Sequence, residues 1–279
     1  MKTYLDCIPC FIRQALEASK MATEDKTRQE KALKAVLSEL KKTSLKDKIP
    51  PQIARKVHRI VRAVTKNNDP YKKVKDKYNK KALKMYPSLK RRVAQSKDRL
   101  LTATKLAIAG NIIDFGPGSK FDLEKTIKDV LVQDFEINHF NQFRKALNSS
   151  KKIIYMGDNA GEIVFDRILL EELKNKEISF VVKGGPIIND ATTEDARFVG
   201  TYKIARIEVI SNGDPGTGPD RQSKEFINKL KNADLVISKG QGNYEALSEV
   251  DANIFFLLKV KCPLIARDIE AKIGDIIIK

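Results

Sequence analysis

The second half of the chain alternates short apolar runs with amphipathic segments. Short apolar runs bounded by glycine, asparagine and acidic residues are typical of buried strands. They predict strands at 152–156, 178–182, 206–210, 234–238 and 253–258, with a further short run at 276–278. The segments between them predict helices at 163–173, 193–199, 222–230 and 244–249. Because strands alternate with helices, we expect an α/β fold with a mostly parallel sheet covered on both faces.

The first half has the hydrophobic period of helices. Apolar positions recur with helical spacing, with breaks at Pro50-Pro51, Asp69-Pro70 and Gly110. The predicted helices span 10–21, 28–40, 52–65, 71–85, 88–109, 123–132 and 138–147. A polar junction at 148–150 then leads into the first strand. We therefore predict an all-helical domain over residues 1–150 and a catalytic α/β domain over residues 151–279.

Charge is divided unevenly between these halves. The chain has 279 residues and a net charge of +17, but residues 1–150 carry 34 Lys and Arg against 16 Asp and Glu, whereas residues 151–279 carry 19 against 20. Such a basic half is typical of solvated helix faces, and it can also steer anionic ligands. A nucleic-acid-binding module is a further alternative. It is disfavoured because the basic half has neither an RNA-binding aromatic signature nor zinc-finger spacing.

Two absences narrow the classes of function. No apolar run approaches the roughly 20 residues needed to cross a bilayer, and the first residues lack the apolar core of a signal peptide, so we expect a cytoplasmic protein without a membrane partner. The only histidines, His58 and His139, both lie in the first half. A metal site in the second half must therefore use carboxylates, amides and backbone oxygens. That ligand set disfavours zinc hydrolase chemistry and favours Mg²⁺, Mn²⁺ or a similar ion.

Candidate chemistry follows the predicted strands. Asp158 and Asn159 come directly after the first strand, and Glu162 opens the helix that follows. In open α/β sheets, ligands bind beyond the carboxyl ends of the strands. Glycine, amide and acidic residues also follow the later strands, within 183–195, 211–220 and 239–244. Glycine-rich loops bring N–H groups close to phosphate oxygens, while neighbouring carboxylates require a cation between themselves and a phosphate.

This combination favours metal-assisted phosphoryl chemistry. Taken singly, each loop is also compatible with an ordinary N-cap or turn. No Asp-x-Asp follows the first strand, which disfavours the aspartyl-phosphate route of haloacid-dehalogenase enzymes. No Gly-x-Gly-x-x-Gly follows it either, which disfavours the main alternative enzyme, an S-adenosylmethionine-dependent methyltransferase.

Several motifs in chain order resemble those of the damage-control phosphatases, long catalogued as domain of unknown function 89. They are Ala-Gly-Asn-Ile-Ile-Asp-Phe-Gly (109–116), Gly-Asp-Asn-Ala-Gly-Glu (157–162), Gly-Gly-Pro-Ile-Ile-Asn-Asp-Ala-Thr (184–192) and Lys-Gly-Gln-Gly-Asn-Tyr-Glu (239–245). Asp6-Cys7-Ile8-Pro9-Cys10 resembles the archaeal-type subfamily, which carries Cys-x-x-Cys near its N-terminus. The resemblance implies a three-layer α/β/α sandwich beside a helical N-terminal domain. It also implies a divalent-metal-dependent phosphatase, using Mn²⁺, Ni²⁺, Co²⁺ or Mg²⁺, that acts on small phosphorylated metabolites.

The resemblance also implies roles for individual residues. Asp158, Asn159 and Asp190 match the family's metal ligands, with Asp195 as the alternative to Asp190. Glu162 is expected to orient a ligand or the substrate. The substrate-contacting stretch is matched by Lys239, Gly240, Gln241, Gly242 and Asn243. The lysine that meets the phosphate elsewhere in the family lies in an Arg-Thr-x-Lys motif, where this chain has Leu258-Lys259-Val260-Lys261. Lys261 is the match, with Lys259 as the alternative.

The expected mechanism is hydrolysis by metal-activated water, with Lys261 and the backbone N–H groups of 240–242 on the phosphate oxygens. Direct attack by Asp158 is the alternative mechanism. Asn111 and Asp114 lie on a loop that either closes over the site or caps the preceding helix. Cys7 and Cys10 form either a buried structural pair or a redox-sensitive or metal-touching pair. With Cys262 as the third cysteine, neither two disulfides nor a four-cysteine zinc site can form.

Overall fold

The computed structural model describes residues 1–46, 48–111, 123–210 and 224–279. Within these ranges one sheet has the strand order β1-β7-β6-β5-β2-β3-β4. Neighbours are parallel throughout, except that β6 and β7 run antiparallel. The strands are β1 (Phe135–Asn138), β2 (Lys152–Met156), β3 (Glu177–Lys183), β4 (Arg206–Ile210), β5 (Leu235–Lys239), β6 (Ile254–Lys259) and β7 (Ile276–Ile278).

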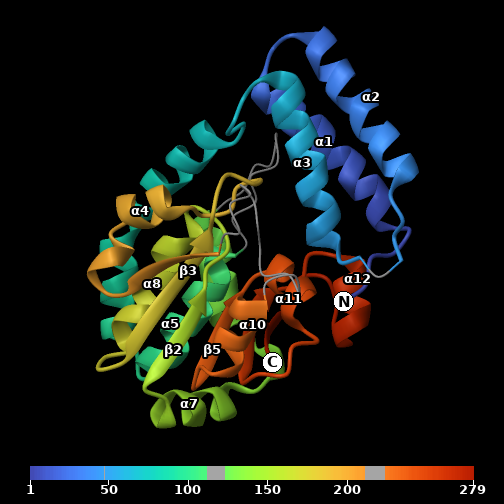
Figure 1. Ribbon diagram of the computed structural model, residues 1–279. Coiled ribbons are helices and arrows are strands. Elements are labelled where there is room, and N and C mark those ends of the chain that lie inside the picture. Colours follow the sequence, from blue (N-terminus) through green and yellow to red (C-terminus); the bar gives the residue numbers. More distant parts are fainter. Residues whose placement is uncertain (47, 112–122, 211–223) are drawn as a thin grey trace.

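Helices cover both faces of this sheet and also form a separate bundle (Figure 1). The bundle consists of α1 (Cys7–Ala22), α2 (Lys26–Lys42) and α3 (Pro50–Thr65). One sheet face packs against α4 (Lys72–Ala94), α5 (Arg99–Gly110), α6 (Leu123–Val132), α7 (Phe140–Ser149) and α8 (Glu162–Glu172). The other packs against α10 (Lys224–Lys231), α11 (Gln241–Leu247) and α12 (Pro263–Ile269). Two short helices, α9 (Thr193–Phe198) and η1 (Thr201–Lys203), precede β4.

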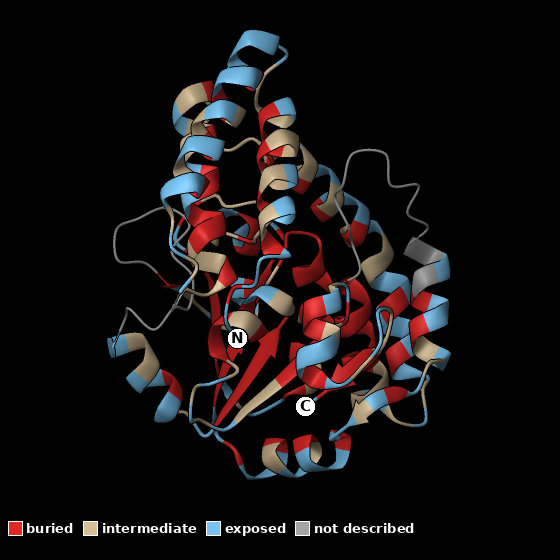
Figure 2. Ribbon diagram, turned by 90° about the vertical axis from the view of Figure 1, so that its right-hand side faces the viewer, coloured by how far each residue is buried: buried red, intermediate tan, exposed pale blue. Residues whose placement is uncertain are grey.

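Side chains of the central strands alternate between two hydrophobic cores. Ile153 and Tyr155 of β2 lie in the core beneath α5 and α8, while Ile154 and Met156 lie in the core beneath α11 and α12. This alternation is the strand period of two. The colouring by exposure in Figure 2 shows the buried strands enclosed by helices whose outer faces are exposed. The three-layer α/β architecture expected from the sequence is therefore confirmed.

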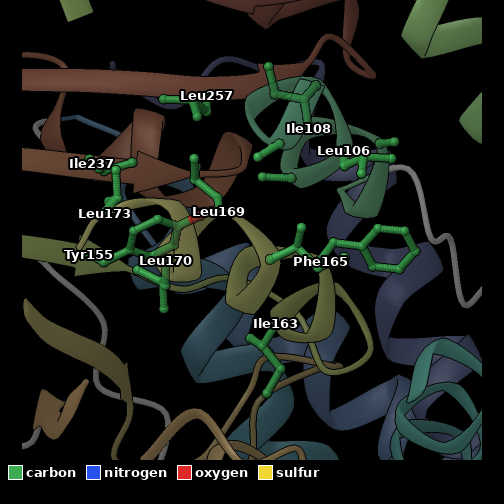
Figure 3. Close-up of a cluster of buried hydrophobic side chains, with 14 of the residues drawn as sticks. Leu106, Ile108, Tyr155, Ile163, Phe165, Leu169, Leu170, Leu173, Ile237 and Leu257 are labelled. Atoms are coloured by element: carbon green, nitrogen blue, oxygen red, sulfur yellow. The ribbon is translucent and has the colours of Figure 1, made fainter. Parts of the chain in front are cut away.

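Helices α5 and α8 form the rigid support on one side of β2. In Figure 3, Phe165 and Leu169 of α8 lie on the side of Leu106 and Ile108 of α5, whereas Leu170 lies beside Tyr155 of β2. These side chains are at most 3 % exposed. Interiors packed in this way resist displacement, so the start of α8, where Glu162 lies, is fixed relative to the sheet.

Some expected boundaries are wrong. β1 was not expected, and it lies in the sheet although it precedes residue 150. The expected division at residue 150 is therefore displaced, because α4 to α7 pack on the sheet and only α1 to α3 stand apart. The helix expected over 88–109 is two pieces, since α4 continues through Pro87 to Ala94. The new helix α5 starts after Asp98, which accepts a hydrogen bond from Leu101 N–H as its N-cap.

Near the C-terminus α12 was also missed. The helix expected at 244–249 begins earlier, at Gln241. Along the described ranges, no helix combines the length and the apolar character that crossing a bilayer requires.

Candidate active site

The site lies where the chain changes direction across the sheet. Strand β2 connects to β3 on one side, whereas β5 returns to pair with β2 on the other. Such a topological switch point opens a crevice at the carboxyl ends of the two strands. Asp158 follows β2 and Gly240 follows β5, so both loops meet here. A Cβ atom on Gly240 would lie 1.8 Å from Asp158 Oδ2, and Gly240 has a φ of +77°, so only glycine fits.

The loops after β2 and β3 are joined by backbone hydrogen bonds. Ala160 N–H donates to Asn189 O at 2.9 Å, and Ala191 N–H donates to Asp158 O at 2.8 Å. Asn159 and Asp190 consequently face each other as an isolated antiparallel bridge. These bonds explain how two aspartates far apart in sequence come to share one rim.

Amide groups surround the first aspartate. Asp158 Oδ2 accepts hydrogen bonds from Asn159 Nδ2 at 2.8 Å and from Asn111 Nδ2 at 3.0 Å. The same two amide nitrogens reach Glu162 Oε2, at 3.0 Å and 3.1 Å. Because the NH₂ groups of both asparagines face the carboxylates of Asp158 and Glu162, the amide oxygens point away from these carboxylates. Asn111 Oδ1 is buried and finds no hydrogen-bond partner in the described part of the chain.

A cavity of about 380 Å³ opens above this rim. Its floor includes Asn111, Asp158, Asn159 and Asp190, and Lys183 and Lys261 also line it. The bundle supplies the opposite wall, with α1 and α3 contributing thiols, prolines and apolar groups, namely Cys7, Cys10, Phe11, Pro50, Pro51 and Ala54. A further bond fixes the bundle to the rim, since Arg62 Nη1 donates to Pro186 O at 2.7 Å. This volume lies within the usual range for small-molecule sites.

Negative charge is concentrated in the floor. Burial and the nearby carboxylates of Glu162 and Asp190 raise the pKa of Asp158 well above its usual value, while Lys183 and Lys261 oppose that rise. Burial likewise raises the pKa of Asp190 against the attraction of Lys183. The ammonium of Lys183 lies 3.7 Å from Asp190 Oδ2. Closely spaced carboxylates of this kind are stabilised by an additional cation.

These residues fit a hard divalent cation. Two carboxylates and an outward amide oxygen are the ligand types that Mg²⁺ and Mn²⁺ prefer. Over the described ranges, no three His, Cys, Asp or Glu side chains gather in metal-binding geometry. A cation here would therefore depend on the amide oxygen of Asn159 as well as on Asp158 and Asp190.

The structure separates the two candidate pairs that the sequence left open. Lys261 is exposed and lines the cavity, whereas Lys259 does not line it. Asp190 also lines it, but Asp195 caps α9 instead. Its Oδ2 accepts hydrogen bonds from Thr192 N–H at 3.0 Å and from the Thr192 hydroxyl at 2.8 Å. Lys261 and Asp190 are thus the members of each pair that can reach a ligand.

Three expectations for the loop after β5 need correction. Lys239 is fully buried and points into the core, so it does not contact a ligand. Asn243 is also fully buried, and its amide donates to Gly157 O and Lys239 O, which ties the two loops together beneath the cavity. Gly240 N–H donates to Leu257 O at 3.2 Å and is not available to a phosphate.

The remaining members of that loop stay candidates for substrate binding. Gln241 and Gly242 line the cavity. The side-chain oxygen of Gln241 accepts hydrogen bonds from the N–H groups of Lys261, at 2.5 Å, and Cys262, at 3.3 Å, so it positions the segment that carries Lys261. Glu162 is fully buried and does not line the cavity, so the expected direct contact with a substrate is wrong. It accepts hydrogen bonds from the floor amides instead, and a role in orienting these ligands stays a prediction.

All three cysteines line the cavity as free thiols. Cys7 and Cys10 lie in the first turns of α1, and Cys262 is the N-cap residue of α12. Burial raises the pKa of both Cys7 and Cys10, so they are protonated at neutral pH. The Cys-x-x-Cys pair is therefore part of the cavity wall.

Sequence reasoning missed other wall residues. Lys183 is the last residue of β3, and its position at the rim was a usable signal. Arg55 of α3 and Glu245 of α11 line the cavity through tertiary packing that no local pattern indicates. Asp114 and the loop at 211–220 lie outside the described residues.

The mostly parallel sheet has acidic and amide side chains at its switch point, with two lysines beside them in one cavity, which is where α/β proteins bind their ligands. Comparison with known proteins is more specific. Residues 3–277 match the family model for the damage-control phosphatase ARMT1-like domain. The chain belongs to this family.

Individual relatives agree over nearly the full length. The chain is 38 % identical to an uncharacterized protein of Methanocaldococcus jannaschii, over 97 % of this chain and 92 % of that protein. It is 35 % identical to a damage-control phosphatase of Pyrococcus horikoshii, over 99 % and 97 %. A crystal structure of a Pyrococcus horikoshii protein from the domain of unknown function 89 family matches with a TM-score of 0.90 and 33 % identity, covering 100 % of this chain and 98 % of that one.

Proposed function

We propose that this protein is a phosphatase of small phosphorylated metabolites, in the class of metabolite-repair enzymes, and that it requires a divalent metal ion. The observation that carries the proposal is the convergence of Asp158, Asn159 and Asp190 on one cavity with Lys183 and Lys261 beside them. Family membership supports the phosphatase class. We also propose the metal and the substrate class. The metal is Mn²⁺, Ni²⁺, Co²⁺ or Mg²⁺, and the substrate is a sugar phosphate, a nucleotide or a related phosphate ester.

Each residue has a role that its surroundings support. Asp158, Asn159 and Asp190 would hold the metal, which when bound supplies a Lewis acid for the phosphate and lowers the pKa of water. Lys261, exposed at the cavity, would neutralise a phosphate oxygen. Gln241 and Gly242 also line the cavity, and their backbone N–H groups would be available to a phosphate, whereas that of Gly240 is already bonded. Lys183 offsets the charge of Asp190 and keeps the floor from repelling the substrate.

The buried carboxylates also define the proton chemistry that this chain itself can provide. Their acceptor oxygens are the groups that can orient a water molecule or take its proton. Asp158 Oδ2 accepts hydrogen bonds from two amide groups, so its position is fixed relative to the cavity floor. We place this aspartate as the residue closest to the attacking water, and direct attack by its carboxylate remains the alternative mechanism.

The test uses p-nitrophenyl phosphate with Mn²⁺, Co²⁺, Ni²⁺ or Mg²⁺, and a control in EDTA. Asp158→Ala and Asp190→Ala are expected to lower kcat/KM at least about 10³-fold, since each removes a metal-binding carboxylate. Asp251→Ala, at an exposed position, is the matched control and should retain activity. Wild-type activity in both site variants, or activity that EDTA leaves unchanged, would refute the proposal. A screen of sugar phosphates, nucleotides and cofactor phosphates then identifies the substrate.

A further inference from the structure

A buried lysine lies directly behind the floor of the cavity. The ammonium of Lys239 contacts Glu162 Oε1 at 2.8 Å, Asp166 Oδ1 at 2.5 Å and the carbonyl oxygen of Ala107 at 2.8 Å. An ammonium has three donors, and all three are used. Lys239, Glu162 and Asp166 are each 0 % exposed. The side chain is therefore committed to the core and cannot reach a ligand.

The strand period explains why Lys239 points this way. Within β5 it shares a face with Leu235 and Ile237, which belong to the core beneath α5 and α8. Its two carboxylate partners both come from α8, and its carbonyl partner comes from α5. The lysine thus joins the switch-point strand to both supporting helices.

Stability alone does not account for this group. Burying a lysine with two carboxylates has a large desolvation cost, and well-packed apolar residues of similar volume are often as stable. The cluster is also connected to the site, because Glu162 uses its remaining lone pairs on the floor. It accepts hydrogen bonds from Asn159 Nδ2 at 3.0 Å and from Asn111 Nδ2 at 3.1 Å.

We propose that Lys239 is a positioning residue that sets the orientation of the amide ligands through Glu162. With the ammonium against its Oε1, Glu162 acts as an acceptor only, so the NH₂ groups of Asn159 and Asn111 must face it. Their oxygens are then directed away from the core. Both residues line the cavity, and Asn111 Oδ1 is the buried oxygen without a partner in the described chain.

This arrangement also adds a ligand to the proposed cation site. Asn111 Oδ1 becomes a second amide oxygen, beside that of Asn159, whose orientation depends on Lys239. The inference rests on the proposed function, because it assumes that a cation binds between these oxygens and the two aspartates. Ligand-orienting partners of this kind commonly change metal affinity 10- to 100-fold when they are removed.

The experiment compares Lys239→Met with Lys105→Met. Lys105 is a matched control, because it is also a buried lysine (9 % exposed) whose ammonium donates to the carbonyl oxygens of Leu131 and Gln133. None of these three residues lines the cavity. Mn²⁺ affinity is measured directly by electron paramagnetic resonance and calorimetry without substrate, and thermal unfolding is recorded for each protein. We expect Mn²⁺ binding about 10- to 100-fold weaker in Lys239→Met. Lys105→Met should keep wild-type affinity even if it is less stable.

A second variant keeps the test decisive if Lys239→Met does not fold. In Glu162→Gln, Lys239 keeps its contact with Asp166, but the new side-chain NH₂ group would face the NH₂ groups of Asn159 and Asn111. These two amides could then no longer donate to residue 162, and the same loss of Mn²⁺ affinity is expected. Wild-type affinity in either folded variant would overturn the inference while leaving the proposed function intact. Failure of the wild-type protein to bind Mn²⁺ would instead overturn both.

Discussion

Gly240 offers the sharpest perturbation of the proposed site. A Cβ atom at this position would lie 1.8 Å from Asp158 Oδ2 and 2.9 Å from Asn111 Nδ2. An ordinary van der Waals contact begins near 3.4 Å, so in Gly240→Ala the carboxylate oxygen must retreat by about 1.6 Å. Asp158 cannot make this movement freely, because two amide groups hold its Oδ2.

The magnitude follows from that displacement. A misplacement of about 1 Å in a reacting group can cost roughly 10²-fold in rate. We therefore expect kcat/KM of Gly240→Ala to fall at least about 100-fold, equivalent to roughly 2.7 kcal/mol of barrier. Mn²⁺ affinity should fall with it, since the displaced group is a proposed ligand. With φ +77° and ψ 168°, Gly240 also occupies a backbone region that is essentially restricted to glycine, which adds a separate cost of about 1–3 kcal/mol in folding stability.

Two other glycines separate these effects. Gly274 has a φ of +100° and open space around its Cβ position, so Gly274→Ala should lose stability through backbone strain but keep Mn²⁺ affinity and activity. Gly242 lies two residues after Gly240, in the first turn of α11, and nothing is close to its Cβ position, so Gly242→Ala should keep Mn²⁺ affinity. The assays are Mn²⁺ titration, p-nitrophenyl phosphate hydrolysis and urea unfolding. A folded Gly240→Ala protein with wild-type Mn²⁺ affinity and kcat/KM would refute the placement of Asp158 at the reaction centre.

Three further predictions concern titratable groups. Burial, reinforced by Arg62, lowers the pKa of His58 to about 4. The unfolded chain therefore binds the extra proton first, and unfolding free energy should fall by up to about 3 kcal/mol as pH drops from 6.5 towards 4. His58→Gln should lose that slope in urea titrations. Burial raises the pKa of Glu245 to about 7. The folded state then keeps its proton longer than the unfolded one, so stability falls as pH rises from 4.5 to 7. An unchanged slope in Glu245→Gln would contradict this assignment. Burial also raises the pKa of Cys10, so iodoacetamide should label it slowly at pH 7 and faster at pH 9, and Mn²⁺ with inorganic phosphate should protect it. A labelling rate that does not change between pH 7 and pH 9, after subtraction of the Cys10→Ser background, would show that the pKa of Cys10 is not raised.

The strands were the most predictable part of the fold. Each predicted strand lies within one residue of an observed one, because runs such as 152–156 are buried on both faces and bounded by turn residues. β1 was missed because its four residues alternate in burial and gain their hydrogen bonds from β7, which is about 140 residues later in the chain. Pairing over that separation leaves no local pattern, and the expected boundary at residue 150 was wrong for the same reason.

The sequence predicted which loops form the site more reliably than which side chains in those loops face a ligand. Asp158, Asn159 and Asp190 were placed correctly at one rim, because the carboxyl ends of parallel strands meet at one edge. Lys239 was assigned to the substrate although it faces the core. The alternation of side chains along β5 already indicated this orientation, since Ile237 and Leu235, two and four residues before Lys239, are apolar and belong to the core. Strand parity should therefore be applied to the last residue of a strand before that residue is assigned to a ligand.

The basic first half can now be interpreted from the cavity. Among the described lysines and arginines of that half, only Arg55 lines the cavity. The positive charges of α4 lie mainly on its exposed face, for example Lys73, Lys77 and Lys84. The cations nearest the proposed phosphate position, Lys183 and Lys261, come from the half with almost no net charge. Most of the excess of +17 is therefore a property of solvated helix surfaces. Binding to a phosphate ester should depend on Lys261 far more than on the charge of α4, because solvent and salt screen the distant lysines.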